Sequence, residues 1–407
     1  MKGKQLAFVL VLLVVVGGVA LYLNNRTTAS WSQTATVATG KILDFPLNDV
    51  SQITIKEGGT EINLVKKEDS WRVKERADYP ADFEKVGSLV RKLWELKPVQ
   101  DVKVGPSQLA RLQLTEPAEG SEHGTLIDLK GAGDKRVAAL LLGKKHLRNE
   151  DESNAPGGSF PIGRYVMPED GSSHVYLVSD TFQEIQMKPE QWLSRDFIKI
   201  ENAESVAVNG TEPGKSWKIT RENATSTAPW KLVDAKPGEE LDNSKAAGAA
   251  AVFNYPNFAD VLPADTSVSE TGLDKPSTVR IETFDGFVYE LKVGKLMGEN
   301  YPVLVSVKAD LPKERPLVPD EKPEDKSKKD EEFQNRQKQL TEKLAKEEKL
   351  PTRPYLIAKG TIDQLLKDRA ALMAEKKSPT ATPGATSPSG VKGTPPNKPP
   401  APAKPKK

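Results

Sequence analysis

The feature that most constrains the fold of this 407-residue chain is an internal similarity. The segment LQLTEPAEGSEHGTLIDLKGAGDKRVAALLLGKK, which begins at Leu112, has the same order of features as GLDKPSTVRIETFDGFVYELKVGK, which begins at Gly272. In each, a leucine, an acidic residue and a proline precede a strand, a turn, a second strand and Gly-Lys. Other parts of the chain correspond at a separation of about 150 to 160 residues, which is too long for a solenoid repeat and suits a duplicated domain. We therefore expect two similar units, at residues 42–194 and 195–376.

The residue pattern within each unit predicts an α+β fold. In the first unit, alternating apolar residues predict short strands that turn at Gly58-Gly59 and lead to Trp71. A helix should follow, with Asp82 as its N-cap and Pro98 as its stop. Its apolar face consists of Phe83, Val86, Leu89, Val90, Leu93 and Trp94. Further strand pairs turn at KGAGDK and at PEDGSS. The predicted fold class is two tandem repeats of an antiparallel β-meander with a packed helix, preceded by one N-terminal transmembrane helix.

The N-terminus carries an apolar run that predicts a membrane anchor. Leu6 to Leu23 is uncharged, and as a helix its 18 residues would extend roughly 27 Å, close to the thickness of a bilayer core. We interpret residues 1–25 as an uncleaved signal anchor, with a signal peptide cleaved before Ser30 as the alternative. Lys2 and Lys4 precede the run, which favours a cytoplasmic N-terminus. The expected location is the bacterial inner membrane, with a linker at 26–41 and the remaining chain in the periplasm.

Two segments depart from the duplicated pattern. The second unit contains an insertion at about 311–350 that is dense in alternating charge, and its later part, from about Asp325 to Lys349, has opposite charges at helical spacing. We expect an exposed helix that projects into solvent and is dispensable for folding, with a docking arm as the alternative. Residues 377–407 are rich in Pro and Lys, which predicts a disordered tail. This basic tail could contact anionic envelope polymers or lipid headgroups, or act only as a solubilising segment.

Composition excludes several classes of function. Lys and Arg number 59 against 57 for Asp and Glu, a balance that argues against a nucleic-acid-binding protein. The absence of Cys excludes disulfides, Cys-ligated metal sites and a lipidated Cys anchor.

No residue pattern identifies a site for chemistry. His123, His146 and His174 fall in predicted loops and turns without metal-ligand spacing, and the second unit has no His. EPGKSW ends like a phosphate-binding loop, but a strand should follow it rather than a helix. The Trp residues beside strands are expected in the core. We therefore predict no catalytic, cofactor-binding or metal-binding residue and no cofactor. A carboxylate pair set by spatial separation alone stays open as an alternative.

Several segments resemble a bacterial family known as domain of unknown function 4340. The resemblance rests on PADFEKVGSLVRKLWELKPVQDV, GLDKP, LKVGK and YPVLVSV, and it extends over about Ile42 to Asp368 as two copies. Gly272 to Pro276 and Gly294-Lys295 keep the most recognisable part, whereas the first copy has Gln113 where the glycine stands. The resemblance implies a membrane-anchored, extracytoplasmic protein associated with ABC-type transporters of the gliding-motility class. It implies no catalytic residue.

These observations favour a non-enzymatic, membrane-tethered accessory or binding protein. Its partners would be membrane lipid, through Leu6 to Leu23, and integral-membrane transporter subunits or a cell-surface assembly, but not nucleic acid. The alternative from a different class is a cell-envelope carbohydrate-binding protein or hydrolase that uses acidic residues in a groove between the two units.

Overall fold

The computed structural model describes residues 40–119, 123–148, 160–225, 227–255, 257–263, 265–315, 323–350 and 353–375. The predicted membrane span, most of the predicted linker and the predicted C-terminal tail lie outside these residues. Among the residues that are described, no helix is both long and apolar enough to cross a membrane.

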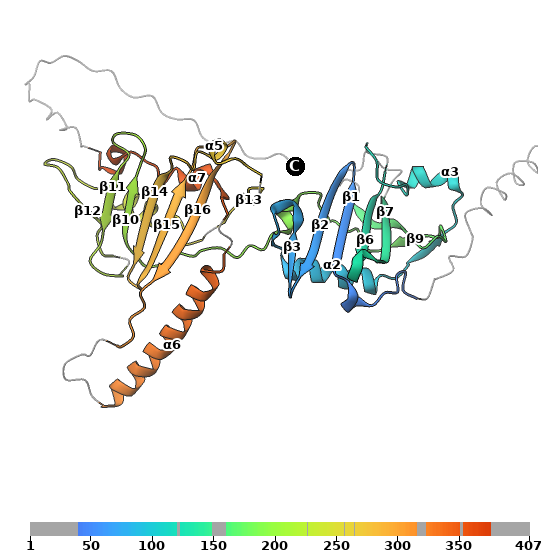
Figure 1. Ribbon diagram of the computed structural model, residues 1–407, viewed down its shortest axis with the longest axis horizontal. Coiled ribbons are helices and arrows are strands. Elements are labelled where there is room, and N and C mark those ends of the chain that lie inside the picture. The colour runs from blue at the N-terminus through green and yellow to red at the C-terminus, as the bar shows by residue number, and fades with distance from the viewer. Residues whose placement is uncertain are drawn as a thin grey trace, which may run out of the picture.

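The described chain forms two mostly antiparallel sheets with a few helices (Figure 1). The first sheet contains nine strands in the order β4-β3-β2-β1-β6-β7-β8-β9-β5. Their bounds are β1 Gln52–Glu57, β2 Thr60–Lys67, β3 Ser70–Val73, β4 Tyr79–Pro80, β5 Gln100–Val102, β6 Thr125–Lys130, β7 Arg136–Leu147, β8 Pro161–Pro168 and β9 Val175–Val178. Most neighbours in the sheet are also neighbours in sequence, as the predicted meander requires.

The second sheet contains eight strands in the order β12-β11-β10-β14-β15-β16-β17-β13. Their bounds are β10 Ala203–Asn209, β11 Trp217–Thr220, β12 Lys231–Leu232, β13 Asp260–Val261, β14 Ser277–Thr283, β15 Phe287–Val293, β16 Asn300–Ala309 and β17 Tyr355–Ala358. In both sheets, the strand that follows the helix in sequence lies at the far edge, beyond the last strand of the meander.

Among the described residues, six α-helices and six short 3₁₀ turns accompany the two sheets. The helices are α2 Phe83–Glu95, α3 Pro106–Leu109, α4 Asn243–Ala250, α5 Val268–Thr271, α6 Pro323–Glu347 and α7 Lys359–Ile362, and the short 3₁₀ turns are η1 Leu47–Asp49, η2 Lys74–Arg76, η3 Ala110–Leu112, η4 Ala132–Asp134, η5 Pro189–Trp192 and η6 Arg369–Leu372. α2 and α4 begin with the same device, because the Asp82 carboxylate accepts a hydrogen bond from the backbone N–H of Lys85 and the Asp242 carboxylate accepts from that of Lys245. In addition, Lys85 Nζ and Lys245 Nζ donate to the carbonyls of Gln191 and Met373, near the end of each unit.

Several sequence predictions are confirmed in detail. Gly58 and Gly59 both have positive φ and join β1 to β2, and KGAGDK and PEDGSS lie between paired strands. The Trp residues beside strands are buried, and β11 follows EPGKSW. The helix prediction for α2 is wrong at Phe83, whose side chain is 65% exposed. This residue occupies the first helical position, and the buried stripe of α2 begins only one turn later, at Val86.

The Gly-Lys motif has a steric explanation. Gly143 in β7 lies very close to the end of η3. A Cβ added at Gly143 would be 2.3 Å from the carbonyl oxygen of Leu112. At Gly294, just after β15, an added Cβ would be 2.1 Å from the carbonyl oxygen of Thr271. The residue after each carbonyl adopts left-handed backbone geometry, with φ of 55° at Gln113 and 69° at Gly272. Gln113 therefore takes the glycine's place without a change of backbone conformation.

The prediction of an exposed helix in the insertion is confirmed for most of its positions but is wrong for one side, which packs on the core. The helix itself is confirmed as α6, but Leu340 and Glu347 are each only 6% exposed. Leu344 and Leu350 also pack against the core. The reason is that α4 contributes mainly small side chains, Ala246, Ala249 and Ala250, to the second unit's core. α6 then covers apolar surface of the same sheet face that α4 leaves open.

The close contact at Gly143 and Gly294 predicts a specific sensitivity. Gly143→Ala and Gly294→Ala should each lower the free energy of unfolding by about 1–3 kcal/mol, because the methyl group collides with a backbone carbonyl that cannot rotate away. Chemical denaturation monitored by tryptophan fluorescence measures the change. Gly248→Ala in α4 is the control, since its Cβ would meet nothing within 4 Å, and it should be neutral or slightly stabilising. Equal stability of all three variants would contradict the steric explanation.

Candidate functional site at the junction of the two sheets

The two units meet along one edge of each sheet. Residues of η2 and β4 in the first unit contact residues at β13 and β17 in the second. Figure 1 shows these two edges facing each other across the middle of the molecule, with β3 on one side and β13 on the other. This junction brings together side chains that lie far apart in the sequence, which makes it the candidate functional site.

A bidentate ion pair crosses the junction. Arg76 donates from Nε to Asp260 Oδ1 and from Nη2 to Asp260 Oδ2, both at 2.7 Å. Both side chains are largely shielded, with exposed fractions of 17% and 19%. The hydrogen bond to Asp260 raises the pKa of the Arg76 guanidinium. Glu190 lies further away, at 3.6 Å from Arg76 Nη2. A planar fork paired with a carboxylate fixes orientation as well as distance, so this pair sets how the two edges align.

The neighbouring residue in η2 points the other way. Glu75 Oε1 accepts hydrogen bonds from the backbone N–H of Asn63 at 2.9 Å and from Asn63 Nδ2 at 3.1 Å. It thereby satisfies a donor of β2 beyond the point where β3 ends. The turn η2 thus stabilises the edge of the first sheet through Glu75 and contacts the second unit through Arg76.

Aromatic side chains fill the junction beside the ion pair. Tyr79, Phe258 and Tyr355 are each at most 2% exposed, and Phe197 packs against the last two with ring centroids 5.3 and 4.7 Å away. The hydroxyls of Tyr79 and Tyr355 are hydrogen-bonded to each other, and burial raises the pKa of both. Arg195 adds a hydrogen bond from Nη1 to the carbonyl of Phe258 at 2.9 Å. The apolar core is therefore continuous from one unit to the other.

A cleft of about 460 Å³ opens beside this aromatic cluster. One wall comes from the first unit and the connecting segment, and the other from the C-terminal end of α6. Its lining residues are Tyr79, Pro80, Ser194, Asp196, Glu342, Ala345, Lys346, Lys349 and Leu350. Lys346 Nζ lies 2.6 Å from Asp196 Oδ1, so an ion pair joins the two walls.

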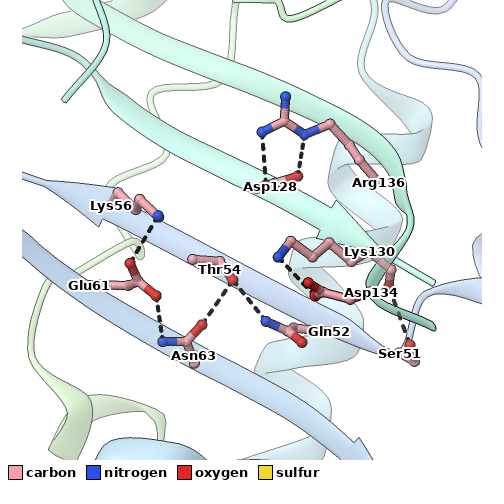
Figure 2. Close-up of polar contacts among 10 residues, drawn as sticks. All are labelled: Ser51, Gln52, Thr54, Lys56, Glu61, Asn63, Asp128, Lys130, Asp134 and Arg136. Atoms are coloured by element: carbon pink, nitrogen blue, oxygen red, sulfur yellow. Dashed lines mark hydrogen bonds and ion pairs between the residues drawn. The ribbon is translucent and has the colours of Figure 1, made fainter. Parts of the chain in front are cut away.

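The open face of the first sheet carries a second group of polar side chains, shown in Figure 2. Thr54, Asn63 and Asp128 are at most 8% exposed on this face. Thr54 donates to Asn63 Oδ1 at 2.9 Å, and Arg136 forms two hydrogen bonds to the Asp128 carboxylate. This pairing with Asp128 raises the pKa of Arg136. Because these groups satisfy one another, the network stabilises strand pairing rather than presenting free polar atoms.

The structure does not gather the histidines into a site. His123 lies 3.1 Å from the Thr115 hydroxyl, and His174 contacts Tyr176. His146 lies in β7, contrary to the predicted loop position, and contacts Tyr165. Within the described ranges, no group of three or more His, Asp or Glu side chains is placed to hold a metal ion.

Sequence reasoning did not single out the residues that build the junction. Arg76, Tyr79, Phe258 and Asp260 belong to no motif, and the Arg76–Asp260 pair joins residues 184 positions apart. A comparison of the two similar halves gives no signal either, because an Asp precedes the last residue of both edge strands, Asp101 in β5 and Asp260 in β13.

The junction geometry predicts strong coupling between Arg76 and Asp260. A double-mutant cycle of Arg76→Ala and Asp260→Ala should give a coupling energy of about 1.5–3 kcal/mol, because both hydrogen bonds are charged and largely shielded from water. Denaturant unfolding of the four proteins measures it. The exposed pair Arg280 and Glu290, with a 2.8 Å separation, is the control and should couple by less than about 1 kcal/mol. Equal coupling in both pairs would show that the junction pair adds nothing beyond a surface contact.

Comparison with known proteins places the chain in a family. Residues 71–276 match the family described as "Domain of unknown function (DUF4340)". The match begins at Trp71 in β3 and ends just before β14, so it includes η2, β4 and β13 of the junction but not β17. No curated protein and no solved structure matches the sequence. Since the match extends over half of the chain, the protein belongs to the DUF4340 family.

Proposed function

We propose that this protein is a membrane-anchored, extracytoplasmic accessory protein that binds a partner without transforming it. The partner is an integral-membrane subunit of an ABC-type transporter or a component of a cell-surface assembly. The anchor is the apolar run from Leu6 to Leu23, with the N-terminus in the cytoplasm and the two units in the periplasm. The basic tail, residues 377–407, contributes contacts with anionic envelope polymers.

The observation that supports a binding role is that polar groups at the junction pair with one another. Asp260 is engaged by Arg76, Asp196 by Lys346 and the hydroxyl of Tyr79 by that of Tyr355. A catalytic site needs polar groups that converge on a position where a reacting atom can sit. The Arg76–Asp260 and Tyr79–Tyr355 contacts instead hold the two units in one orientation, which is what a preorganised binding surface requires.

We further propose that the two units are tandem copies of one ancestral domain. The strand orders of the two sheets correspond, apart from the short extra edge strand β4. The Asp N-caps of α2 and α4 and the crowded glycines Gly143 and Gly294 occupy corresponding places. Independent origins would have to produce the same cap and the same steric contact twice.

A carbohydrate-binding protein or hydrolase is the competing proposal. It would use acidic side chains of the junction cleft, where Asp196 and Glu342 are the carboxylates among the lining residues. Glycoside hydrolysis requires two carboxylates on opposite sides of a sugar, one of them protonated.

Affinity purification of the full-length protein from its own membranes separates these proposals. An accessory protein should recover an integral-membrane transporter or cell-surface protein, and recovery should fall at least about tenfold when Asp196→Lys and Lys346→Glu jointly reverse the charges of the cleft walls while retaining their pairing. The same double reversal at the exposed pair Arg280 and Glu290 is the matched control and should leave recovery unchanged.

A different outcome would refute binding to a membrane partner. If no membrane protein is recovered, but an envelope glycan binds or is cleaved and Asp196→Asn abolishes this effect, the accessory proposal is wrong. For the anchor, removal of residues 1–25 should leave the protein soluble in the cytoplasm. A mature form beginning near Ser30 would instead support a cleaved signal peptide.

A further inference from the structure

α6 is an unusual addition to the second unit. It is inserted between β16 and β17, where the first unit has only the short turn between β8 and β9. Its C-terminal half packs on the core-facing side of β15 and β16, and Lys343 Nζ lies 4.8 Å from the Phe287 ring centroid. Figure 1 shows the helix extending from the lower end of the second sheet, with its C-terminal end nearer the sheet and the middle of the molecule. The same end forms one wall of the junction cleft.

The contacting face of α6 contains few apolar residues. The positions of this face that are buried or half-buried recur every three or four residues, as expected for one side of a helix. They are Asp330, Phe333, Gln337, Leu340, Lys343, Leu344 and Glu347. Only three of the seven are apolar, and of these three only Leu340 is fully buried. This face therefore removes little apolar surface from water compared with that of α2, which buries Val86, Leu89, Val90 and Leu93.

A buried carboxylate occupies the last position of this face. Glu347 Oε2 accepts a hydrogen bond from the Tyr289 hydroxyl at 2.8 Å, and Oε1 accepts one from the backbone N–H of Lys199 at 3.0 Å. Lys343 Nζ lies 3.9 Å from Oε1. Lys346, also on α6, is paired with Asp196, and Lys199 Nζ is paired with Glu201. Glu347 thus depends on two specific donors to offset the loss of its water.

We propose that α6 is a releasable strap, whose C-terminal half detaches from β15 and β16 as a unit while both sheets stay folded, and whose detachment removes one wall of the junction cleft. The sparse apolar face makes attachment weak compared with the folding of the sheets. The donors to Glu347 make attachment specific to one position. This inference concerns the chain alone and holds whether or not the cleft binds a partner.

Attachment of the strap should weaken as pH rises. Burial raises the pKa of Glu347 above its ordinary value, because the charged form loses hydration when α6 is attached. A carboxyl group with a raised pKa in the attached state favours attachment most at pH values below its ordinary pKa. That contribution is lost as pH rises through the raised value.

Cysteine labelling of the full-length protein tests the proposal, since the chain contains no native Cys. Three single-cysteine variants are compared: Leu340→Cys under the strap, Gln339→Cys on its exposed side and Val303→Cys in the core of the second sheet. Leu340→Cys should react at least about tenfold more slowly than Gln339→Cys and at least about tenfold faster than Val303→Cys. The Gln339→Cys rate also corrects for thiol ionisation.

Two variants of the polar contact complete the test. Tyr289→Phe removes one donor and should speed labelling at position 340 several-fold without changing the rate at position 303. The ratio of the rates at positions 340 and 339 should rise from about pH 5 to about pH 8, and Glu347→Gln should abolish this dependence because its amide does not titrate. If positions 340 and 303 react at the same rate in every variant, α6 opens only with the whole unit and the proposal is wrong. Equal labelling rates at positions 340 and 339 would also refute the proposal, because they would show that α6 is never attached.

Discussion

In each sheet of this protein one face carries most of the apolar side chains and must be covered, and this constraint explains most of the architecture. In the first unit, α2 alone brings Val86, Leu89, Val90 and Leu93 to the sheet. In the second, α4 is shorter and brings mainly alanines, so that Phe287 and Tyr289 of β15 would face water without further cover. α6 supplies that cover from an insertion. A highly charged segment thus becomes part of the hydrophobic core through the few apolar residues on one of its sides.

The same requirement connects the fold to the junction. Covering β15 directs the C-terminal end of α6 toward the segment that links the two units, where Lys346 meets Asp196. The aromatic cluster of Tyr79, Phe258 and Tyr355 lies beside this contact and extends the core across the two sheet edges. The cleft between Pro80 and α6 is therefore a consequence of how the second unit completes its own core.

Local sequence patterns predicted the parts of the fold that depend on local interactions. The Gly58-Gly59 turn, the Asp82 cap and the extent of α6 follow from residues within a few positions of one another. The attachment of α6 was not predictable in this way. Charge density favours an exposed helix, and the decisive fact is that α4 is too small, which appears only when both helices are placed on one sheet. For the same reason, no local pattern marks Arg76 and Asp260 as partners, since each is an ordinary surface charge until the two edges meet.

If the two units are copies of one domain, features that both units keep and features that only one has carry different information. The Asp caps and the crowded glycines occur in both units, and each has a local structural role that any copy of the fold requires. In the described residues, the Arg76–Asp260 pair and α6 each occur once, and neither is needed to form a meander sheet. Duplication frees one copy to acquire contacts that the other does not need. Because the unshared features converge on the junction, the property that distinguishes this protein from a pair of independent domains belongs to the junction rather than to either sheet face.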